Sequence, residues 1–240
     1  MADTVGGAEK SVGETPEFYV PSQGLDLQPY LRDGDIAGIH HLARYHWACQ
    51  VLAHLQPARV LDVACGAGYG THMLADALPG SAVTGCDYDP RSKIHADAHY
   101  RRDNLRFVAG NMVTWQYRQT GEPMGRYDGI VSFDTIEHLL HREVAILSIV
   151  RNLADDGVFL FSTPCAHEAD VLNPGWEHHK IEYSYRTLVP LLKYFFRSVA
   201  MAGDPDFIAG AFWTDVINRD VLRYPTIGNP LICRGPIRHG

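Results

Sequence analysis

The sequence predicts an α/β fold in which a doubly wound, seven-stranded and mostly parallel sheet carries helices on both faces. Three observations favour this fold class. Short β-rich runs bounded by Gly, Asp and Pro alternate with stretches of helical length, which is the pattern of repeated βαβ units. Several runs are almost continuously apolar, as strands buried on both faces of a parallel sheet are. One run leads straight into a glycine-rich turn and a helix, as in nucleotide-binding folds.

The chain has 240 residues, of which 46% are hydrophobic, enough for one packed core. Residues 1–17 mix Gly, Ser, Thr, Glu and Pro without periodicity, which predicts a disordered tail. Residues 18–240 are then expected to form a single domain. Within it, residues 18–56 are expected to supply N-terminal lid helices. Residues 165–183 are too long for a simple connection and are expected to form a substrate loop.

The individual elements follow from local patterns. Apolar residues from Ile36 to Leu55 recur at intervals of three and four, which predicts an amphipathic helix that ends before Pro57. The β-rich runs predict strands over 59–64, 82–89, 105–111, 127–134 and 157–164. The stretches between them predict crossover helices over 69–78, 91–102 and 142–153. A helix over 185–195 and strands near 199 and over 231–233 are expected to complete the sheet.

Composition narrows the class of partner. Lysine and arginine number 21 against 28 acidic residues, a formal charge of −7, which opposes general binding to nucleic acid. The five cysteines include no CxxC pair, so neither a disulfide framework nor a zinc–thiolate site is indicated. No apolar run approaches the roughly 20 residues that cross a bilayer, and the first residues do not resemble a signal peptide. We therefore expect a cytoplasmic protein that does not bind membranes.

The most informative segment is the strand, turn and helix start over residues 60–70, Val-Leu-Asp-Val-Ala-Cys-Gly-Ala-Gly-Tyr-Gly. Gly66 and Gly68 allow the backbone to pass close to a ligand. Asp62 lies in the strand, where its carboxylate suits a cationic ligand better than a pyrophosphate. The next strand ends at Asp87, the position of an acid that accepts hydrogen bonds from ribose hydroxyls. Tyr88 then offers a ring for an adenine.

These segments resemble the class I S-adenosylmethionine-dependent methyltransferases, in which a D-x-x-C-G-x-G-x-G loop holds the methionine moiety of the cofactor. Residues 61–70 match that loop, 86–89 match the ribose-binding acid, and 132–139 match the motif at the fourth strand. Residues 39–45, 161–165 and 173–179 are similar to a bacterial subgroup associated with sugar, polysaccharide and natural-product methylation. The resemblance covers roughly residue 21 to the C-terminus.

The resemblance implies S-adenosyl-L-methionine as the cofactor. The residues expected to bind it are Tyr19, His41, Arg44, Asp62, Ala64, Gly66, Gly68, Asp87, Tyr88, Asn111, Met112 and Phe133. Tyr19, His41 and Arg44 would form a lid. The family usually has an acid near the adenine after the third strand, whereas this chain has Asn111 and Met112, and Asn can still bond the base. Simpler alternatives stay open: Tyr88 and Asn111 could be turn residues, and His41, Arg44 and Tyr45 could lie on a solvated helix face.

Methyl transfer requires an aligned nucleophile, exclusion of water and removal of a proton from the acceptor. The fourth strand ends in Asp134, and His138, with an ordinary pKa near 6.5, follows it. These two are the expected catalytic residues. Alternatively, Asp134 and Glu137 form a helix-capping pattern and His138 is an interior residue. Trp176, His178 and His179 in the expected substrate loop are candidate substrate-binding residues.

The sequence thus predicts a methyltransferase that acts on an O or N atom of a small molecule, a sugar-containing or natural-product metabolite. It leaves open whether the enzyme is a homodimer. Transfer without a metal is favoured. One alternative is a metal-assisted 2′-O-methyltransferase of RNA ends, because Asp134, Glu137, His138 and His179 partly resemble the metal site of small-RNA methyltransferases. The other is a non-catalytic cofactor-binding partner subunit, which the glycine loop and Asp87 disfavour.

Overall fold

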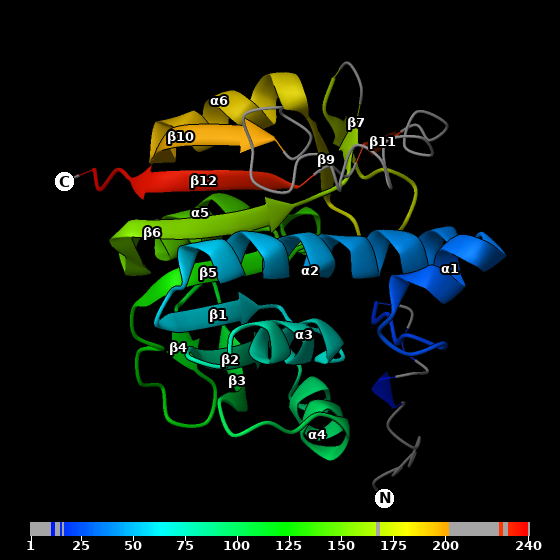
Figure 1. The fold of residues 1–240 in the computed structure, drawn as a ribbon. Helices are drawn as coiled ribbons and strands as arrows, with labels where there is room; N and C mark the ends of the chain where they lie inside the picture. Colours follow the sequence, from blue (N-terminus) through cyan, green and yellow to red (C-terminus); the bar gives the residue numbers. More distant parts are fainter. Residues whose placement is uncertain are drawn as a thin grey trace, which may run out of the picture.

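The computed structural model describes residues 11–12, 15, 17–166, 169–201, 226–227 and 230–239. Its main sheet has the strand order β10-β12-β6-β5-β1-β2-β3-β4 (Figure 1). The strands are β1 (Arg59–Val63), β2 (Ala82–Asp87), β3 (Leu105–Asn111), β4 (Gln116–Tyr117), β5 (Tyr127–Phe133), β6 (Leu153–Ser162), β10 (Phe196–Met201) and β12 (Leu231–Pro236). β1, β2, β3, β5 and β6 are joined by parallel pairings, whereas β4, β10 and β12 pair antiparallel. The predicted fold class is confirmed, with the two-residue β4 as an addition.

Helices cover both faces of this sheet. They are α1 (Leu27–Asp33), α2 (Ile36–Leu55), α3 (Tyr69–Ala77), α4 (Pro90–His99), α5 (Arg142–Asn152) and α6 (Tyr185–Phe195). Figure 1 shows α2 and α3 on the near side of the sheet and α5 behind it. Alternate strand residues face these two layers, because Val60 and Leu160 pack with α2 and α3 while Leu61 and Phe161 pack with α5 and α6. This alternation is the pleat of a sheet buried on both sides.

Local chemistry explains where the helices begin and end. Asp35 precedes α2 and its carboxylate accepts a hydrogen bond from the Gly38 amide at 3.0 Å. Asp89 does the same for α4 through the Arg91 amide at 2.9 Å, and Pro90 opens that helix. Such side-chain caps satisfy amides that have no partner in the first helical turn. The predicted bounds of α2 agree with the structure to the residue, and α6 lies where a helix was expected.

The segment after β6 builds a second, small sheet. It contains β7 (Cys165–Ala166), β9 (Ile181–Ser184), β8 (Val171–Leu172) and β11 (Thr226–Ile227), in the order β11-β7-β9-β8. Figure 1 places β7, β9 and β11 beyond the carboxyl end of β6. A short 3-10 helix, η2 (Ile136–His138), follows β5 at the same end. The expected tail over residues 1–17 falls mostly outside the described residues. Among the helices that are described, none is long and apolar enough to cross a membrane.

Candidate active site

Three adjoining hollows open at the carboxyl ends of the central strands, where doubly wound sheets bind ligands. The first, here the lid hollow, has a volume of about 80 Å³. The second, the apolar hollow, has a volume of about 280 Å³. The third, the outer hollow, measures about 320 Å³. Ala64, directly after β1, lines all three, and Asp87 lines both the apolar and the outer hollow. The three hollows therefore adjoin one another.

The glycine-rich turn between β1 and α3 forms one wall of this pocket. Gly66 and Gly68 have φ values of 54° and 86°, which L side chains adopt only with strain. A Cβ on Gly68 would lie 2.6 Å from that of Ala96. The Asp87 carboxylate ties the turn to β2 by accepting the amides of Gly66 and Asp89, each at 2.9 Å. The sequence analysis expected Asp87 and the two glycines at one site, and the structure brings Asp87 into contact with Gly66.

Asp87 retains capacity for a ligand. Burial raises the pKa of Asp87 to about 6, against the opposing effect of the Asp89 and Gly66 amides. Each oxygen of a carboxylate can accept two hydrogen bonds, and each Asp87 oxygen accepts one from the backbone. The ionised side chain can therefore accept two more from a diol.

The apolar hollow follows from the ends of β2 and β3. Met112 is buried and lines it together with Val63, Cys86 and Val113. Asn111 also lines it, and its side-chain oxygen accepts the Val113 amide at 2.8 Å, so the residue does serve as a turn former. Tyr88 is 61% exposed at the rim. The Arg118 guanidinium lies 4.5 Å from its ring centre. The shape and lining suit a flat, largely apolar ring system.

Asp62 is fully buried and lies behind the pocket rather than in its lining. It accepts hydrogen bonds from the Thr71 hydroxyl at 2.7 Å and from the Tyr45 hydroxyl at 3.2 and 3.3 Å. Burial raises the pKa of Asp62 to about 7, although both hydrogen bonds oppose the shift. Tyr45 itself lines the lid hollow. Direct contact between Asp62 and a ligand stays a prediction, and the geometry favours an action through Tyr45.

At the lid hollow, the N-terminal segment packs against α2. The rings of Tyr19 and His41 stack with centroids 4.3 Å apart and planes 6° apart. Burial, assisted by the Arg44 guanidinium, lowers the pKa of His41 to about 4, so the imidazole is neutral at pH 7. Arg44 is 5% exposed rather than solvated. Phe133 closes the hollow with its ring edge-on to that of Tyr45.

Asp134 is held as the partner of Arg44. Its carboxylate forms an ion pair with Arg44 and accepts the Ser162 hydroxyl at 2.9 Å. Burial raises the pKa of Asp134, but Arg44, His41 and Ser162 outweigh that effect and hold it below its ordinary value. The residue that directly precedes η2 is Thr135, which makes no side-chain cap there. The capping alternative therefore has no support, and as a catalytic residue Asp134 is better placed to position Arg44 than to take a proton.

His138 lines the outer hollow beside Asp134. Its Nδ1 lies 3.2 Å from the carbonyl oxygen of His178. Because a carbonyl only accepts, we assign the proton of the neutral ring to Nδ1, which leaves Nε2 with a lone pair. Burial, together with His179, lowers the pKa of His138. The ring is thus neutral at pH 7 and its Nε2 is a free electron-pair donor.

The expected substrate-binding residues gather around His138. The Trp176 ring stands edge-on to the rings of His138, His178 and His179, with centroids 5.6, 5.0 and 4.6 Å away. His178 Nδ1 lies 2.9 Å from a carboxylate oxygen of Glu17 in the N-terminal segment. The segment before β9 and the segment before α1 thus meet over the outer hollow.

Several residues of the site were not among those predicted. The pocket lining also includes Glu17, Phe18, Tyr69, Thr135 and Leu139. Two of these could have been found by spacing, since Tyr69 follows Gly68 and Thr135 follows Asp134. Glu17 fell in the expected tail, and Phe18, the first residue of the expected lid segment, carried no pattern that marks a site residue.

Comparison with known proteins agrees with this geometry. Residues 39–195 match the family described as "Methyltransferase domain". A Mycolicibacterium smegmatis protein named "Probable S-adenosylmethionine-dependent methyltransferase" is 36% identical over 122 residues, which are 50% of this chain and 44% of the relative. The malonyl-[acyl-carrier protein] O-methyltransferase of Geobacter sulfurreducens is 34% identical over 110 residues, 45% of this chain and 39% of the relative. The chain spans less than half the length of these curated relatives.

Solved structures share the fold at low identity. The 1,6-didemethyltoxoflavin-N1-methyltransferase of Burkholderia thailandensis, bound to S-adenosylhomocysteine, superposes with a TM-score of 0.58 and 20% identity over 88% of this chain and 85% of that one. A polyketide-synthase O-methyltransferase of Brevibacillus brevis gives a TM-score of 0.58 and 13% identity over 91% and 82%. The chain therefore belongs to the methyltransferase-domain family and has the fold of the class I S-adenosylmethionine-dependent methyltransferases.

Proposed function

We propose that this chain transfers the methyl group of S-adenosyl-L-methionine to an O or N atom of a small molecule. The observation that carries the proposal is the set of three adjoining hollows that extends from the Gly66 turn and Asp87 to His138. When bound, the cofactor supplies a methyl group that its sulfonium has already activated. The names of the two curated relatives support methyl transfer, in one case dependent on S-adenosylmethionine and in the other to an oxygen atom.

The residues present suit the three parts of this cofactor. Asp87 can accept two hydrogen bonds from a ribose, and the apolar hollow suits an adenine. Two residues that line the lid hollow each carry a buried polar atom without a hydrogen-bond partner among the described residues, Oη of Tyr19 and Nε of Arg44. Buried groups of this kind ordinarily bind a ligand or water. A methionine moiety, with its carboxylate and ammonium groups, would satisfy them.

The acceptor is expected to bind at the outer hollow. The Trp176 ring, 41% exposed, offers a flat surface for a sugar or another ring, and His178 and His179 flank it. Small-molecule relatives support this class of acceptor, since the solved neighbours include the toxoflavin enzyme and a domain crystallised with D-fucose. His138 presents the Nε2 lone pair at the outer hollow, beside the acceptor whose proton has to be removed. Glu137 and His179 lie beside it.

Amino-acid composition supports two further parts of the proposal, the cellular location and the exclusion of RNA as acceptor. We place the protein in the cytoplasm, because the spacing of its five cysteines indicates no disulfide framework, as is usual for proteins of a reducing compartment. Methylation of RNA ends is disfavoured by the formal charge of −7, since RNA binding draws much of its affinity from basic side chains.

Two measurements test the proposal together. Calorimetric titration with S-adenosylhomocysteine should show one site per chain. Incubation of the protein with S-adenosylmethionine and a panel of glycosides and amine-bearing metabolites should yield S-adenosylhomocysteine with at least one acceptor. Binding without turnover on any acceptor would favour a non-catalytic partner subunit, and the absence of binding would contradict the proposal.

A further inference from the structure

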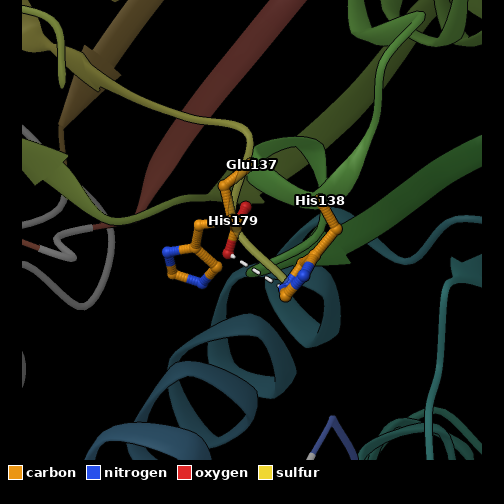
Figure 2. Close-up of side chains that lie close together, drawn as sticks. All are labelled: Glu137, His138 and His179. Carbon is orange, nitrogen blue, oxygen red and sulfur yellow. Dashed lines mark ion pairs between the residues drawn. The ribbon is translucent and has the colours of Figure 1, made fainter. Parts of the chain in front are cut away.

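We propose that Glu137, His138 and His179 form a binding site for one divalent transition-metal ion at the acceptor side of the pocket. Figure 2 shows the three side chains turned toward one another, two from η2 and one from the segment before β9. One potential ligand atom from each lies within 4.8 Å of the other two. The gap between His138 Nε2 and Glu137 Oε1 is 3.8 Å.

One polar atom of each of these three side chains already has a partner outside the cluster. His138 Nδ1 donates to the His178 carbonyl at 3.2 Å, and His179 Nδ1 lies 2.8 Å from a carboxylate oxygen of Glu182. The second oxygen of Glu137, Oε2, accepts the Thr163 hydroxyl at 2.8 Å. Metal-binding histidines and carboxylates are oriented by outer partners of this kind. The arrangement leaves Nε2 of both imidazoles and Oε1 of Glu137 as the remaining acceptors.

Glu137 Oε1 is the atom that most requires a partner. The residue is 0% exposed, and this oxygen has no hydrogen-bond partner among the described residues. It faces the unprotonated Nε2 of His138 across 3.8 Å, a distance too long for a shared proton. Burial, with Asp134 acting in the same direction, raises the pKa of Glu137 well above its ordinary value, and a cation bound at Oε1 would favour the ionised form. A metal ion would satisfy both atoms at once.

The set of ligands indicates the kind of ion. Two imidazoles and one carboxylate suit Zn²⁺, Co²⁺ or Mn²⁺, whereas Mg²⁺ and Ca²⁺ prefer sites made of oxygen alone. Asp134 is not available as a fourth ligand, because its carboxylate binds Arg44 and Ser162. Three protein ligands leave a position for a further molecule, as in catalytic zinc sites. His138 lines the outer hollow, so that position faces the acceptor.

The consequence for chemistry rests on the proposed function. A hydroxyl group bound to the ion loses its proton to water more readily than a free one. Its oxygen can then bond to the methyl carbon while the carbon–sulfur bond breaks and leaves its electron pair on sulfur. The site therefore favours a hydroxyl acceptor over an amine, which needs no such activation.

Cobalt binding tests the site without any assay of activity. The rings of His95 and His99, one turn apart on α4, stack with centroids 4.1 Å apart and offer a surface site, so the parent protein carries His99→Ala. We titrate this chelator-treated protein, free of any affinity tag, with Co²⁺ and follow visible absorption and heat. One Co²⁺ should bind per chain, and Zn²⁺ should displace it.

Variants locate the ion. His179→Ala should weaken Co²⁺ binding by at least about 100-fold, and Glu182→Gln by about 10- to 100-fold. Glu137→Gln, which keeps the size of the side chain, is a second test should His179→Ala disturb its loop. His178→Ala is the matched control: it removes the neighbouring imidazole but keeps the carbonyl that holds His138, and affinity should stay within about twofold.

Titration of each variant with S-adenosylhomocysteine separates this inference from the proposed function. The inference predicts loss of Co²⁺ binding in His179→Ala with unchanged affinity for S-adenosylhomocysteine. Failure of the parent to bind Co²⁺, or equal binding by the parent, His179→Ala and Glu137→Gln, would overturn the metal site and leave the proposed function standing. His138 would then be the group that takes the proton from the acceptor.

Discussion

Asp87→Ala is expected to weaken binding of S-adenosylhomocysteine by about 5- to 150-fold. Asp87 accepts the Gly66 and Asp89 amides and has capacity for two ribose hydroxyls. Removing the carboxylate leaves those hydroxyls without partners in a buried pocket, which costs about 1–3 kcal/mol of binding free energy. At tenfold per 1.4 kcal/mol this range gives the stated loss of affinity.

The pH dependence of binding provides a second check on the same residue. The pKa of Asp87 is raised to about 6 from an ordinary 3.8, chiefly by burial. The ionised form is the better acceptor for hydroxyls, so affinity should fall as the pH drops below about 6. The free protein should respond with the opposite sign. Because the carboxyl pKa is higher in the folded than in the unfolded state, the contribution of Asp87 to the free energy of unfolding decreases as the pH rises from about 3.8 to about 6. Above about pH 6 this contribution is constant.

Titration calorimetry between pH 5 and pH 8 measures the loss of affinity in Asp87→Ala and the dependence of affinity on pH. Asp76→Ala is a suitable control, because this carboxylate pairs with Arg102 on the exposed surface far from the pocket. Its affinity should equal that of the unmodified protein. Unchanged affinity in a folded Asp87→Ala variant would refute the assignment of Asp87 to the ribose, and the ligand would have to be held elsewhere.

Three further substitutions test separate parts of the structure. Gly68→Ala combines a left-handed φ with a Cβ 2.6 Å from Ala96, so thermal unfolding should reveal a loss of about 1–3 kcal/mol; an unchanged Tm would mean that the turn relaxes freely. Arg44→Met leaves the Asp134 carboxylate uncompensated and should cost about 3 kcal/mol in urea unfolding, part of which the double variant with Asp134→Asn should restore; strictly additive losses would count against the pair. His138→Ala should lower kcat by about 10²- to 10⁴-fold with S-adenosylhomocysteine affinity unchanged, whereas a drop in Tm with full activity per folded molecule would indicate a packing role.

Local sequence patterns predicted the main fold well because each carries its own physical cause. The helix α2 combines a capping Asp35, apolar spacing and a following Pro57, and its bounds agree with the structure. The start of β6 was predicted four residues late. Its first residues include the polar Asp155 and Asp156, and the β5–β6 register shifts between Tyr127 and Gly129, so no alternation marked them as strand. The two-residue strands of the small sheet are too short to show a period at all.

The site residues also differ in whether local sequence patterns predict them. Gly66 and Asp87 were predictable because a turn and a strand end at fixed spacing define them. The state of Asp134 was not, since its ionisation depends on Arg44, which lies 90 residues earlier in the chain. The approach of His179 to Glu137 depends on a contact between their segments, in which the Lys180 amide donates to the Glu137 carbonyl at 2.6 Å. Composition and spacing do not predict such pairings, and only the resemblance to small-RNA methyltransferases grouped His179 with Glu137.

The central claim is that the pocket between the Gly66 turn and Asp87 holds S-adenosylmethionine with its reactive end toward His138. A crystal structure with S-adenosylhomocysteine tests it most directly. The account predicts both ribose hydroxyls within hydrogen-bond distance of the Asp87 carboxylate, the adenine in the apolar hollow against Met112, and the sulfur facing the outer hollow. A ligand bound outside this pocket, or one whose ribose does not contact Asp87, would contradict it.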